Sequence, residues 1–179
     1  MAKQIGLTKG KATIVDNAWY HVFRQFQWHY TMPTNQNKQG YAARRVSLGH
    51  RQSKIMYMHH FILPPVQGYV IDHRNGNCLD NRYLNLRYCT VVENNYNSPR
   101  RREGQSQYKG VSRAKTAGTW RANIYLEGRQ KNLGVFDTEK AAAWAYNVEA
   151  QKAHGIYAFL NPVSHSDALP RRTAHRKQT

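Results

Sequence analysis

Acidic residues, cysteines and long apolar runs are all scarce in this sequence, and each shortage excludes a class of protein. No stretch approaches the ~20 consecutive apolar residues that a helix needs to cross a bilayer. No apolar segment follows the lysines of residues 1–10, so we expect no secretory signal. Two cysteines in 179 residues, Cys78 and Cys89, are too few for a disulfide framework, which favours a reducing, intracellular setting.

The shortage of acidic residues leaves a large positive charge. The chain has 10 Asp and Glu against 27 Lys and Arg, a formal net charge of +17 at pH 7. Both halves of the sequence are basic, so the charge is not confined to a tail. A polyphosphate backbone is the usual partner of such a surface. An anionic membrane is the competing partner, but the long basic amphipathic helix that would favour it is absent from the sequence.

The segment 94–107 is the clearest break in the chain, because it has almost no apolar residue and carries Pro99 and Gly104. The run 100–102 within it is Arg-Arg-Arg, which is either solvated charge or a phosphate contact. We divide the chain as follows: a β-rich region 1–57, a motif-bearing region 58–97, a basic linker 98–107, a second domain 108–161 and a basic, disordered tail 162–179.

The region before the linker has short apolar stretches separated by turn signals, a pattern typical of strands. The turn signals are at 33–35, 38–40 and 64–65. The predicted strands are 13–15, 20–26, 41–48, 55–63 and 69–71. The aromatic residues predicted to form the core are Trp19, Tyr20, Phe23, Phe26, Trp28 and Tyr30.

The region after the linker predicts a three-stranded antiparallel sheet with one helix. Residues 119–126 alternate between apolar and polar side chains, so they form a strand with one buried face. Residues 108–113 and 130–136 flank it, with Glu127-Gly128 as the hairpin turn. Thr138 can cap the following helix and Gly155 can end it. The helix should turn Ala141, Ala145 and Val148 toward the sheet.

The segment 70–94 carries the groups that metal-assisted hydrolysis of a phosphodiester requires. A strand ends at Asp72-His73, an Asn-, Gly- and Asp-rich loop follows, and a short helix begins near Thr90. Such a reaction needs a hard oxygen ligand for Mg²⁺ and a base that takes a proton from water. The pattern alone leaves a polar turn with Asx motifs open. It also leaves open a zinc site at the two cysteines, although the CxxC pairs of structural sites are missing.

Several motifs in this part of the chain resemble the HNH homing endonucleases, phage- and intron-borne nucleases with a ββα-metal site. The motifs are Met58-His59-His60-Phe61-Ile62-Leu63, Val70-Ile71-Asp72-His73-Arg74-Asn75-Gly76, Asn81-Arg82, Asn85-Leu86-Arg87 and the stretch from Thr90 to Asn94. They agree in order over about 40 residues. The resemblance implies an enzyme that cleaves double-stranded DNA with Mg²⁺ or Mn²⁺ inside a bacterial or phage-infected cell.

The resemblance also implies roles for single residues. Asp72 corresponds to a metal ligand from the strand, and Asn94 to the second ligand from the helix. His73 corresponds to the general base that activates water. Asn85 corresponds to the asparagine that braces the loop, and His59 to a residue that touches phosphate or packs under the site.

The sequence departs from the family pattern at two positions. His60 stands where family members commonly have arginine, so a contact that depends on that arginine does not carry over. The last position is Asn94 rather than histidine, as in one branch of the family. Asn95 follows it directly, which leaves the register of the ligand open by one residue.

The region 108–161 resembles the Apetala/ethylene-response-factor DNA-binding domain of plant transcription factors, which lays its sheet in the major groove. The matching motifs are Tyr108-Lys109-Gly110-Val111, Trp120-Arg121-Ala122, Leu133-Gly134-Val135-Phe136-Asp137-Thr138, the helix 141–146, Gly155 and Asn161. The groove-facing positions differ from the plant residues, so the target preference should not transfer. We expect DNA contacts from Arg113, Arg121, Asn123, Tyr125, Arg129, Gln130 and Asn132, with Ser112 on the same face.

Together these features predict an α+β protein: a β-rich N-terminal half with a ββα-metal site, a linker, and a three-stranded antiparallel sheet packed on one helix. The predicted function is site-specific endonucleolytic cleavage of duplex DNA, and no oligomeric partner is implied. A DNA-binding regulator with an inactive nuclease half is the alternative. An RNA-binding protein fits the charge but not a sheet that enters the major groove.

Overall fold

The computed structural model describes residues 1–32, 39–99 and 106–168. The predicted turns at 33–35 and around Lys38, the Arg100–Arg102 run and the tail from 169 onward lie outside these residues. The chain divides into two compact units, Met1–Asn95 and Tyr96–Thr179. None of the helices in the described ranges is long and apolar enough to cross a membrane.

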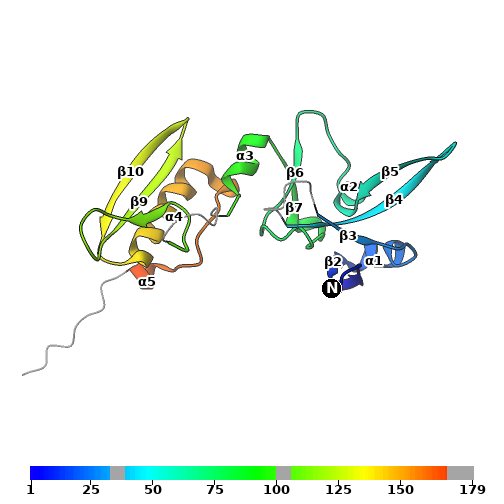
Figure 1. Cartoon of the computed structure of the whole chain (residues 1–179), viewed down its shortest axis with the longest axis horizontal. Helices are drawn as coiled ribbons and strands as arrows, with labels where there is room; N and C mark the ends of the chain where they lie inside the picture. The colour runs from blue at the N-terminus through cyan, green and yellow to red at the C-terminus, as the bar shows by residue number, and fades with distance from the viewer. Residues whose placement is uncertain (33–38, 100–105, 169–179) are drawn as a thin grey trace, which may run out of the picture. The chain divides into compact units, whose positions relative to one another are not determined.

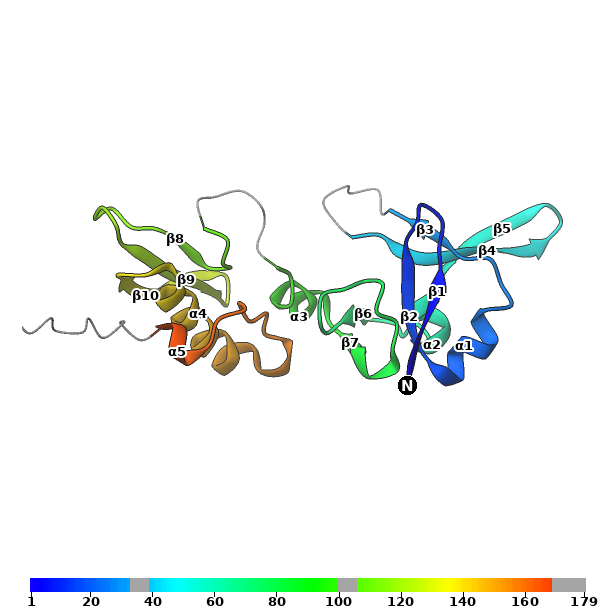
Figure 2. The ribbon, with the colours of Figure 1, turned by 90° about the horizontal axis from the view of Figure 1, so that it is seen from below.

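The first unit combines three small antiparallel sheets with short helices (Figures 1 and 2). Strands β1 and β2 form a hairpin, β3, β4 and β5 form a sheet in that order, and β6 pairs with β7. The bounds are β1 Ala2–Gly6, β2 Ala12–Asp16, α1 Asn17–Phe23, β3 His29–Thr31, β4 Tyr41–Gly49, β5 Gln52–Tyr57, α2 Met58–Ile62, β6 Val70–His73, β7 Leu86–Cys89 and α3 Val91–Tyr96.

Two of the strand predictions for this unit are wrong. Most of the predicted strand 20–26 belongs to helix α1, and the predicted strand 55–63 becomes helix α2 after Tyr57. Trp19 and Phe23 stack with their ring centroids 5.1 Å apart, which is the i, i+4 contact of a helix. The apolar runs are too short for their period to separate strand from helix, so packing decided the outcome. Strands β1, β3 and β7 were missed.

One core holds the first unit together. Its buried members come from β1, β2, α1, β4, α2, β7 and the loop before β3: Ile5, Val15, Phe23, Trp28, Ala42, Met58, Ile62 and Leu86. Of the aromatic residues predicted to be core, Phe23 and Trp28 are buried, whereas Phe26 is 43% exposed. Strand β2 also reaches the loop after β6, because Ile14 N–H donates to Leu79 O and Asn81 N–H donates to Ile14 O, both at 2.8 Å.

The second unit confirms the expected three-stranded antiparallel sheet with one helix against it (Figure 2). Its elements are β8 Val111–Arg113, β9 Trp120–Leu126, β10 Arg129–Phe136, α4 Glu139–His154 and α5 His165–Ala168. Thr138 caps α4, since its Oγ1 accepts from Ala141 N–H at 3.1 Å. Gly110 has φ of 75°, and a Cβ there would lie 2.1 Å from the Tyr146 ring. The close packing of helix on sheet therefore requires glycine at that position.

Three details of the second unit correct the sequence analysis. The face of α4 buried against the sheet includes Ala142, Ala143 and Tyr146, whereas Val148 of the expected stripe is 37% exposed. The face of the helix expected to be buried is one residue out of phase with the face that is buried, because Tyr146 fills the space beside Gly110. The strand predicted at 108–113 begins only at 111, and the expected tail starts with helix α5, where Asp167 pairs with Lys140 at 2.7 Å.

Candidate functional site

The Asp72-His73 pair ends strand β6, and the two side chains have different partners. In the antiparallel pairing with β7, Asp72 lies opposite Arg87 and His73 lies opposite Leu86. Arg87 donates to Asp72 Oδ2 from Nε at 2.8 Å and from Nη2 at 2.6 Å. Both residues of the Asp72-His73 pair are buried. Successive residues of a strand point to opposite faces, so the carboxylate and the imidazole leave the strand on opposite sides, although Asp72 is still close enough to affect the pKa of His73.

A chain of hydrogen bonds fixes the orientation of the His73 ring. The Thr13 hydroxyl donates to Leu79 O at 2.8 Å, so its oxygen accepts from Asn81 Nδ2, also at 2.8 Å. The longer contact of this hydroxyl to Met58 Sδ, at 3.9 Å, is far weaker. With its NH₂ group used in this way, Asn81 turns Oδ1 toward His73 Nε2 at 3.3 Å.

This arrangement determines which ring nitrogen can accept a proton. An amide oxygen accepts hydrogen bonds and cannot donate them. His73 Nε2 must therefore carry the hydrogen, and the lone pair of the neutral ring lies on Nδ1. Burial lowers the pKa of His73 below its ordinary value, against smaller opposing effects of the Asn81 hydrogen bond, Asp72 and Asp80. The ring is thus neutral near pH 7, as a general base must be.

His59 lies beside His73, with ring centroids 5.3 Å apart and the rings nearly perpendicular. Burial, together with the neighbouring His73 and His60, lowers the pKa of His59 to about 3. Its Nδ1 is buried and has no hydrogen-bond partner among the described residues. A neutral His59 can offer a hydrogen bond to an incoming ligand, but it adds no positive charge to the site.

Tyr41 and Tyr57 form a wall around the two histidines. The ring of Tyr57 stacks on His59 with 6° between the planes, and the ring of Tyr41 lies 6.2 Å from that of His73. Both tyrosines belong to the region 1–57, to which sequence analysis assigned no role. Tyr41 is the first residue of β4 and Tyr57 is the last of β5, so this sheet delivers aromatic rings to the site.

The loop between β6 and β7 is held by side chains that bond its own backbone. Asn85 accepts from Asn75 N–H at 3.1 Å and donates to Asp80 O at 2.7 Å. The Asp80 carboxylate receives Arg82 Nε at 2.8 Å and Nη2 at 2.6 Å, and this pairing with Arg82 lowers the pKa of Asp80. Every one of these bonds fixes the path of the loop that presents Asn81 to His73.

Helix α3 follows β7 and carries Asn94. A capping box starts the helix: Glu93 Oε2 accepts from Thr90 N–H at 2.7 Å, and Thr90 Oγ1 accepts from Glu93 N–H at 3.2 Å. Asn94 is half-buried, whereas Asn95 is exposed. Within the described residues, no group of three or more His, Cys, Asp and Glu side chains could hold a metal ion. Cys78 and Cys89 are not joined in a disulfide.

A divalent ion fits the chemistry of the donor pair that the sequence suggests. Asp72 offers a carboxylate and Asn94 an amide oxygen, both hard ligands. Mg²⁺ is bound by only one or two protein carboxylates and keeps several of its waters. Arg87 occupies Asp72 Oδ2, so an ion at this carboxylate would share or replace that ion pair.

In the second unit, the strand register collects polar side chains on the face of the sheet away from α4. Asn132 pairs with Asn123, Gln130 pairs with Tyr125, and Ser112 pairs with Arg121. Paired residues share a face. The β9 residues on the other face of the sheet, which include Ala122 and Ile124, pack in the cores beneath α4.

The side chains of Arg113 and Arg129 do not lie on that polar face. Arg113 pairs with Trp120, and its guanidinium carbon lies 4.9 Å from the centroid of that ring. Arg129 pairs with Leu126 at the hairpin turn. Both side chains are exposed at strand ends, so they can reach a ligand only around the rim of the sheet. Arg121 is therefore the one cation among the expected DNA contacts that lies on the polar face.

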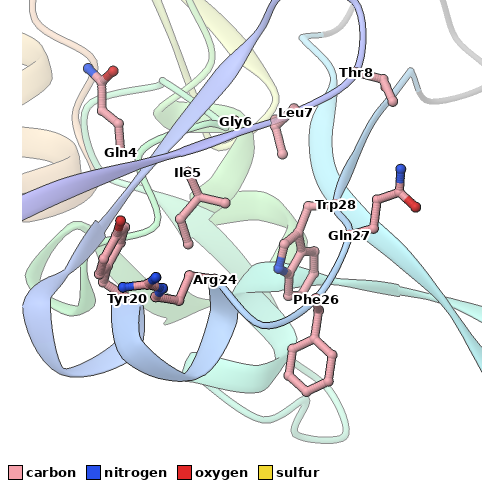
Figure 3. Close-up of a pocket in the computed structure, with 10 residues that line it drawn as sticks. All are labelled: Gln4, Ile5, Gly6, Leu7, Thr8, Tyr20, Arg24, Phe26, Gln27 and Trp28. Atoms are coloured by element: carbon pink, nitrogen blue, oxygen red, sulfur yellow. The ribbon is translucent and has the colours of Figure 1, made fainter.

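Sequence reasoning missed the residues that position the site. Thr13, Tyr41 and Tyr57 are distant in sequence from Asp72-His73, and no local motif links them to it. Asn81 was part of a quoted motif but had no role assigned. A surface recess lies elsewhere in the first unit, lined by β1, helix α1 and the segment that follows it (Figure 3). None of the candidate nuclease residues lines it.

Comparisons with known proteins agree with the two-part organisation. Residues 55–96 match the model of the HNH endonuclease family. The chain is 35% identical over 95 residues to protein 3.8 of Escherichia phage T7, covering 53% of this chain and 78% of the phage protein.

A second set of relatives comes from plants and matches a different part. The chain is 43% identical over 60 residues to the AP2-like ethylene-responsive transcription factor TOE2 of Arabidopsis thaliana, covering 34% of this chain and 12% of that protein. It is 41% identical over 71 residues to APETALA2-like protein 2 of Oryza sativa subsp. japonica, covering 40% of this chain and 16% of that protein. The plant similarity lies in the C-terminal region. With the family motif at β6–α3 and most of a phage protein matched, the chain belongs to the HNH endonuclease family.

Proposed function

We propose that this protein is a site-specific DNA endonuclease of the homing type, which hydrolyses phosphodiester bonds of duplex DNA with Mg²⁺ or Mn²⁺. The observation that carries the proposal is the buried, neutral His73, whose Nε2–H is bonded to Asn81. This leaves Nδ1 to accept a proton. A base fixed in this way suits the activation of water, and it lies inside the segment that matches the HNH endonuclease model.

In this mechanism His73 Nδ1 takes the proton of the attacking water. The water oxygen forms a bond to phosphorus, the bond from phosphorus to the 3′-oxygen breaks, and the leaving oxygen takes a proton from solvent. A general base of this kind typically contributes ~10²–10⁴-fold to the rate. Asn85 braces the loop behind the base, and His59 donates a hydrogen bond to the scissile phosphate or packs beneath it.

Asp72 and Asn94 are the proposed metal ligands, with Asn94 preferred over Asn95 because it is the less exposed of the two. The chemistry that a divalent ion supplies there is stabilisation of the charge on the scissile phosphate and the leaving oxygen. Arg87 holds the Asp72 carboxylate in place.

The domain 108–161 is proposed to locate the target. The polar face of its sheet offers Arg121, Asn123, Tyr125, Gln130 and Asn132 to base edges in the major groove, a surface on which each base pair is distinguishable. Arg113 and Arg129 at the rim contact phosphates, which position the module without reading sequence. The basic linker 98–107 joins this module to the nuclease motif 58–97, and the basic tail 162–179 follows it.

A DNA-binding regulator with an inactive nuclease half remains the second candidate. The observation that favours it is the Asp72–Arg87 ion pair, because the only carboxylate among the proposed ligands already has a cationic partner. The two candidates differ in one property, cleavage that depends on a divalent metal.

Nicking of supercoiled plasmid, with Mg²⁺ or with EDTA, separates the candidates. The wild-type chain should convert supercoiled to open-circular or linear DNA only with the metal. His73→Ala should lose at least ~10²-fold in rate while it binds the plasmid as tightly as wild type. Asn94→Ala should be inactive and Asn95→Ala active. Cleavage by His73→Ala within threefold of wild type would refute the general-base role, and the reverse asparagine result would shift the ligand by one residue.

A further inference from the structure

We infer that the β4–β5 hairpin is a second DNA-binding element, which grips the duplex backbone beside the nuclease site. We call residues 44–54 of this hairpin the basic ribbon. The inference deepens the proposed function and rests on it, because it assigns to the same DNA a contact that neither the family match nor the C-terminal module provides.

The basic ribbon is the most exposed regular structure of the first unit. From residue 47 to residue 55, all side chains are exposed. Figures 1 and 2 show β4 and β5 extending as a pair beyond α2 and β3. Nothing in the core of this unit requires strands of this length, because its buried members on β4 end at Ala43. The extension therefore serves something outside the folded unit.

The charge of the ribbon is of one sign. It carries four lysine and arginine side chains and one histidine: Arg44, Arg45, His50, Arg51 and Lys54. The sequence has no Asp or Glu between Asp16 and Asp72. In the described parts of the chain, the ion pairs involve none of the ribbon residues. Arg45 donates instead to the Ser53 hydroxyl at 2.9 Å. These cations are available for a polyanion.

One face of the hairpin is covered by the unit itself. Ala42 is part of the core, and the Arg44 guanidinium carbon lies 3.9 Å from the centroid of the Phe26 ring. Ala42 and Arg44 have the same parity along β4. Their face is therefore turned toward the body of the unit.

The other face of the hairpin is continuous with the nuclease site. Tyr41 and Arg45 alternate with the covered residues, and Tyr57 pairs with Ala43 on the same face. The rings of Tyr41 and Tyr57 are 5.5 Å apart, and Tyr41 also reaches His73 at 6.2 Å. A phosphate backbone placed at His73 can therefore continue along the row that begins at Tyr41 and leads to Arg45 and the tip.

The tip of the ribbon holds two residues in an unfavourable conformation. His50 and Arg51 have φ of 46° and 64°, the left-handed region that favours glycine. A two-residue hairpin turn of this kind usually contains Asn-Gly. The ribbon instead places an imidazole and a guanidinium there, at a cost in backbone strain. Strain of this kind clusters at functional sites, although Lys9 and Glu127 also have positive φ at the turns of two other hairpins.

The dimensions and shape of the ribbon fit B-form DNA. Tyr41 to His50 at the tip is nine residues along the strand, which at ~3.3 Å per residue is about 30 Å. This is less than one turn of duplex, ~34 Å, so the contacts should lie within about one turn of the scissile phosphate. The major groove of B-DNA admits a two-stranded ribbon, whereas the deep, narrow major groove of A-form RNA does not. The occupant is therefore duplex DNA.

The test compares two double variants of the full chain, each carrying His73→Ala to prevent cleavage. Arg45→Gln/Arg51→Gln removes two charges from the ribbon, one on the face shared with Tyr41 and one at the tip. Lys3→Gln/Arg24→Gln removes two charges that lie over the Tyr20 ring and serves as the matched control. Fluorescence anisotropy with a ~30-base-pair duplex at several salt concentrations gives affinity and salt dependence for each.

The ribbon variant should bind about tenfold more weakly at moderate salt, and the slope of log K against log salt should fall by about 0.9 for each phosphate that the variant no longer neutralises. The control should stay within about twofold of the parent. Hydroxyl-radical protection on one side of the cleavage site should disappear in the ribbon variant. Equal slopes for the two double variants, or equal competition by duplex RNA of the same sequence, would overturn the inference.

A third variant, Arg51→Gly, guards against a folding artefact. Glycine relieves the left-handed strain at the tip, so the variant should be at least as stable as the parent in thermal unfolding and should still bind DNA more weakly. Unchanged affinity in this variant counts against the ribbon. Plasmid nicking separates this inference from the proposed function: if wild type fails to nick while the ribbon variants still bind DNA more weakly, only the nuclease proposal falls.

Discussion

At the residue scale, the base chemistry proposed for His73 depends on the direction of a single amide. The Asn81 side chain can present either oxygen or nitrogen to His73, and the two orientations are close in shape. Thr13 selects the orientation, because its hydroxyl proton is used on Leu79 O and its oxygen can only accept. A threonine on the first hairpin thus chooses the tautomer of a histidine on β6.

We predict that Thr13→Val lowers the cleavage rate by about 10–100-fold, the range found for partners that orient functional histidines. Valine keeps the shape of threonine but cannot accept from Asn81 Nδ2, so the amide loses its preferred orientation. Nitrogen-15 NMR of the His73 ring should show hydrogen on Nε2 in wild type and a mixture of tautomers in the variant. This spectroscopic readout would not change if Thr13 only filled space.

Thr13→Ser is the matched control for that prediction. Serine retains the hydroxyl and should keep both the wild-type tautomer and most of the activity. A Thr13→Val variant with the wild-type NMR pattern and wild-type rate would show that the amide is oriented by something else.

At the scale of single elements, β10 is the most direct test of the reading surface. Gln130 and Asn132 lie on the polar face of the sheet with their partners Tyr125 and Asn123. Lys131 lies between them in sequence and points the other way, where its Nζ pairs with Glu149 of α4 at 2.6 Å. Neighbouring positions of one strand therefore have opposite surroundings.

We predict that Gln130→Ala/Asn132→Ala reduces discrimination between the preferred duplex and a scrambled one by about 1–3 kcal/mol for each base that is no longer recognised. The salt dependence of binding should not change, since no charge is removed. Lys131→Gln removes a cation yet should have the smaller effect on discrimination. Titration of wild type and both variants on both duplexes measures this discrimination. A larger effect of Lys131→Gln would show that the residues that recognise bases do not lie on the polar face of the sheet.

At the scale of the whole first unit, the buried imidazoles connect stability to pH. The pKa of His59 is about 3 in the folded chain, against an ordinary value of 6.5, chiefly because of burial. The unfolded chain therefore binds a proton that the folded chain does not. A group with a lowered folded pKa contributes stability that is fully present above pH ~6.5 and is lost as the pH falls toward 3. Burial lowers the pKa of His73 and His60 as well, in the same direction.

We predict that the free energy of unfolding of residues 1–95 falls between pH 7.5 and pH 5, with about 2 kcal/mol of the decrease due to His59 alone. His59→Gln should flatten the profile by that amount. Hydrogen exchange of the slowest amides in β2 and β6 measures it. His50→Gln, at an exposed imidazole, is the control and should keep the wild-type profile. A His59→Gln profile as steep as wild type would show that His59 is protonated in the folded chain.

Local patterns in the sequence determined much of this protein. The alternation in β9, the capping residues Thr138 and Thr90, and the turn at Glu127 and Gly128 act over a few residues. Their physical consequences are therefore visible in the order of the amino acids. The excess positive charge, which predicted a nucleic acid partner, is also visible in the order of the amino acids. The type and spacing of Asp72-His73 left a polar turn open, and only the resemblance to HNH endonucleases favoured hydrolysis.

Tertiary structure alone decided the rest, because the deciding contacts join residues far apart in the chain. Short aromatic runs fit strand and helix equally well, and packing of Phe23 into the core made α1 a helix. The one-residue error in the phase of α4 arose in the same way, from the fit of Tyr146 over Gly110. The bond between Thr13 and Asn81 spans 68 positions. No periodicity encodes such a contact, so the proton-accepting nitrogen of His73 becomes identifiable only when the first hairpin folds against the loop after β6.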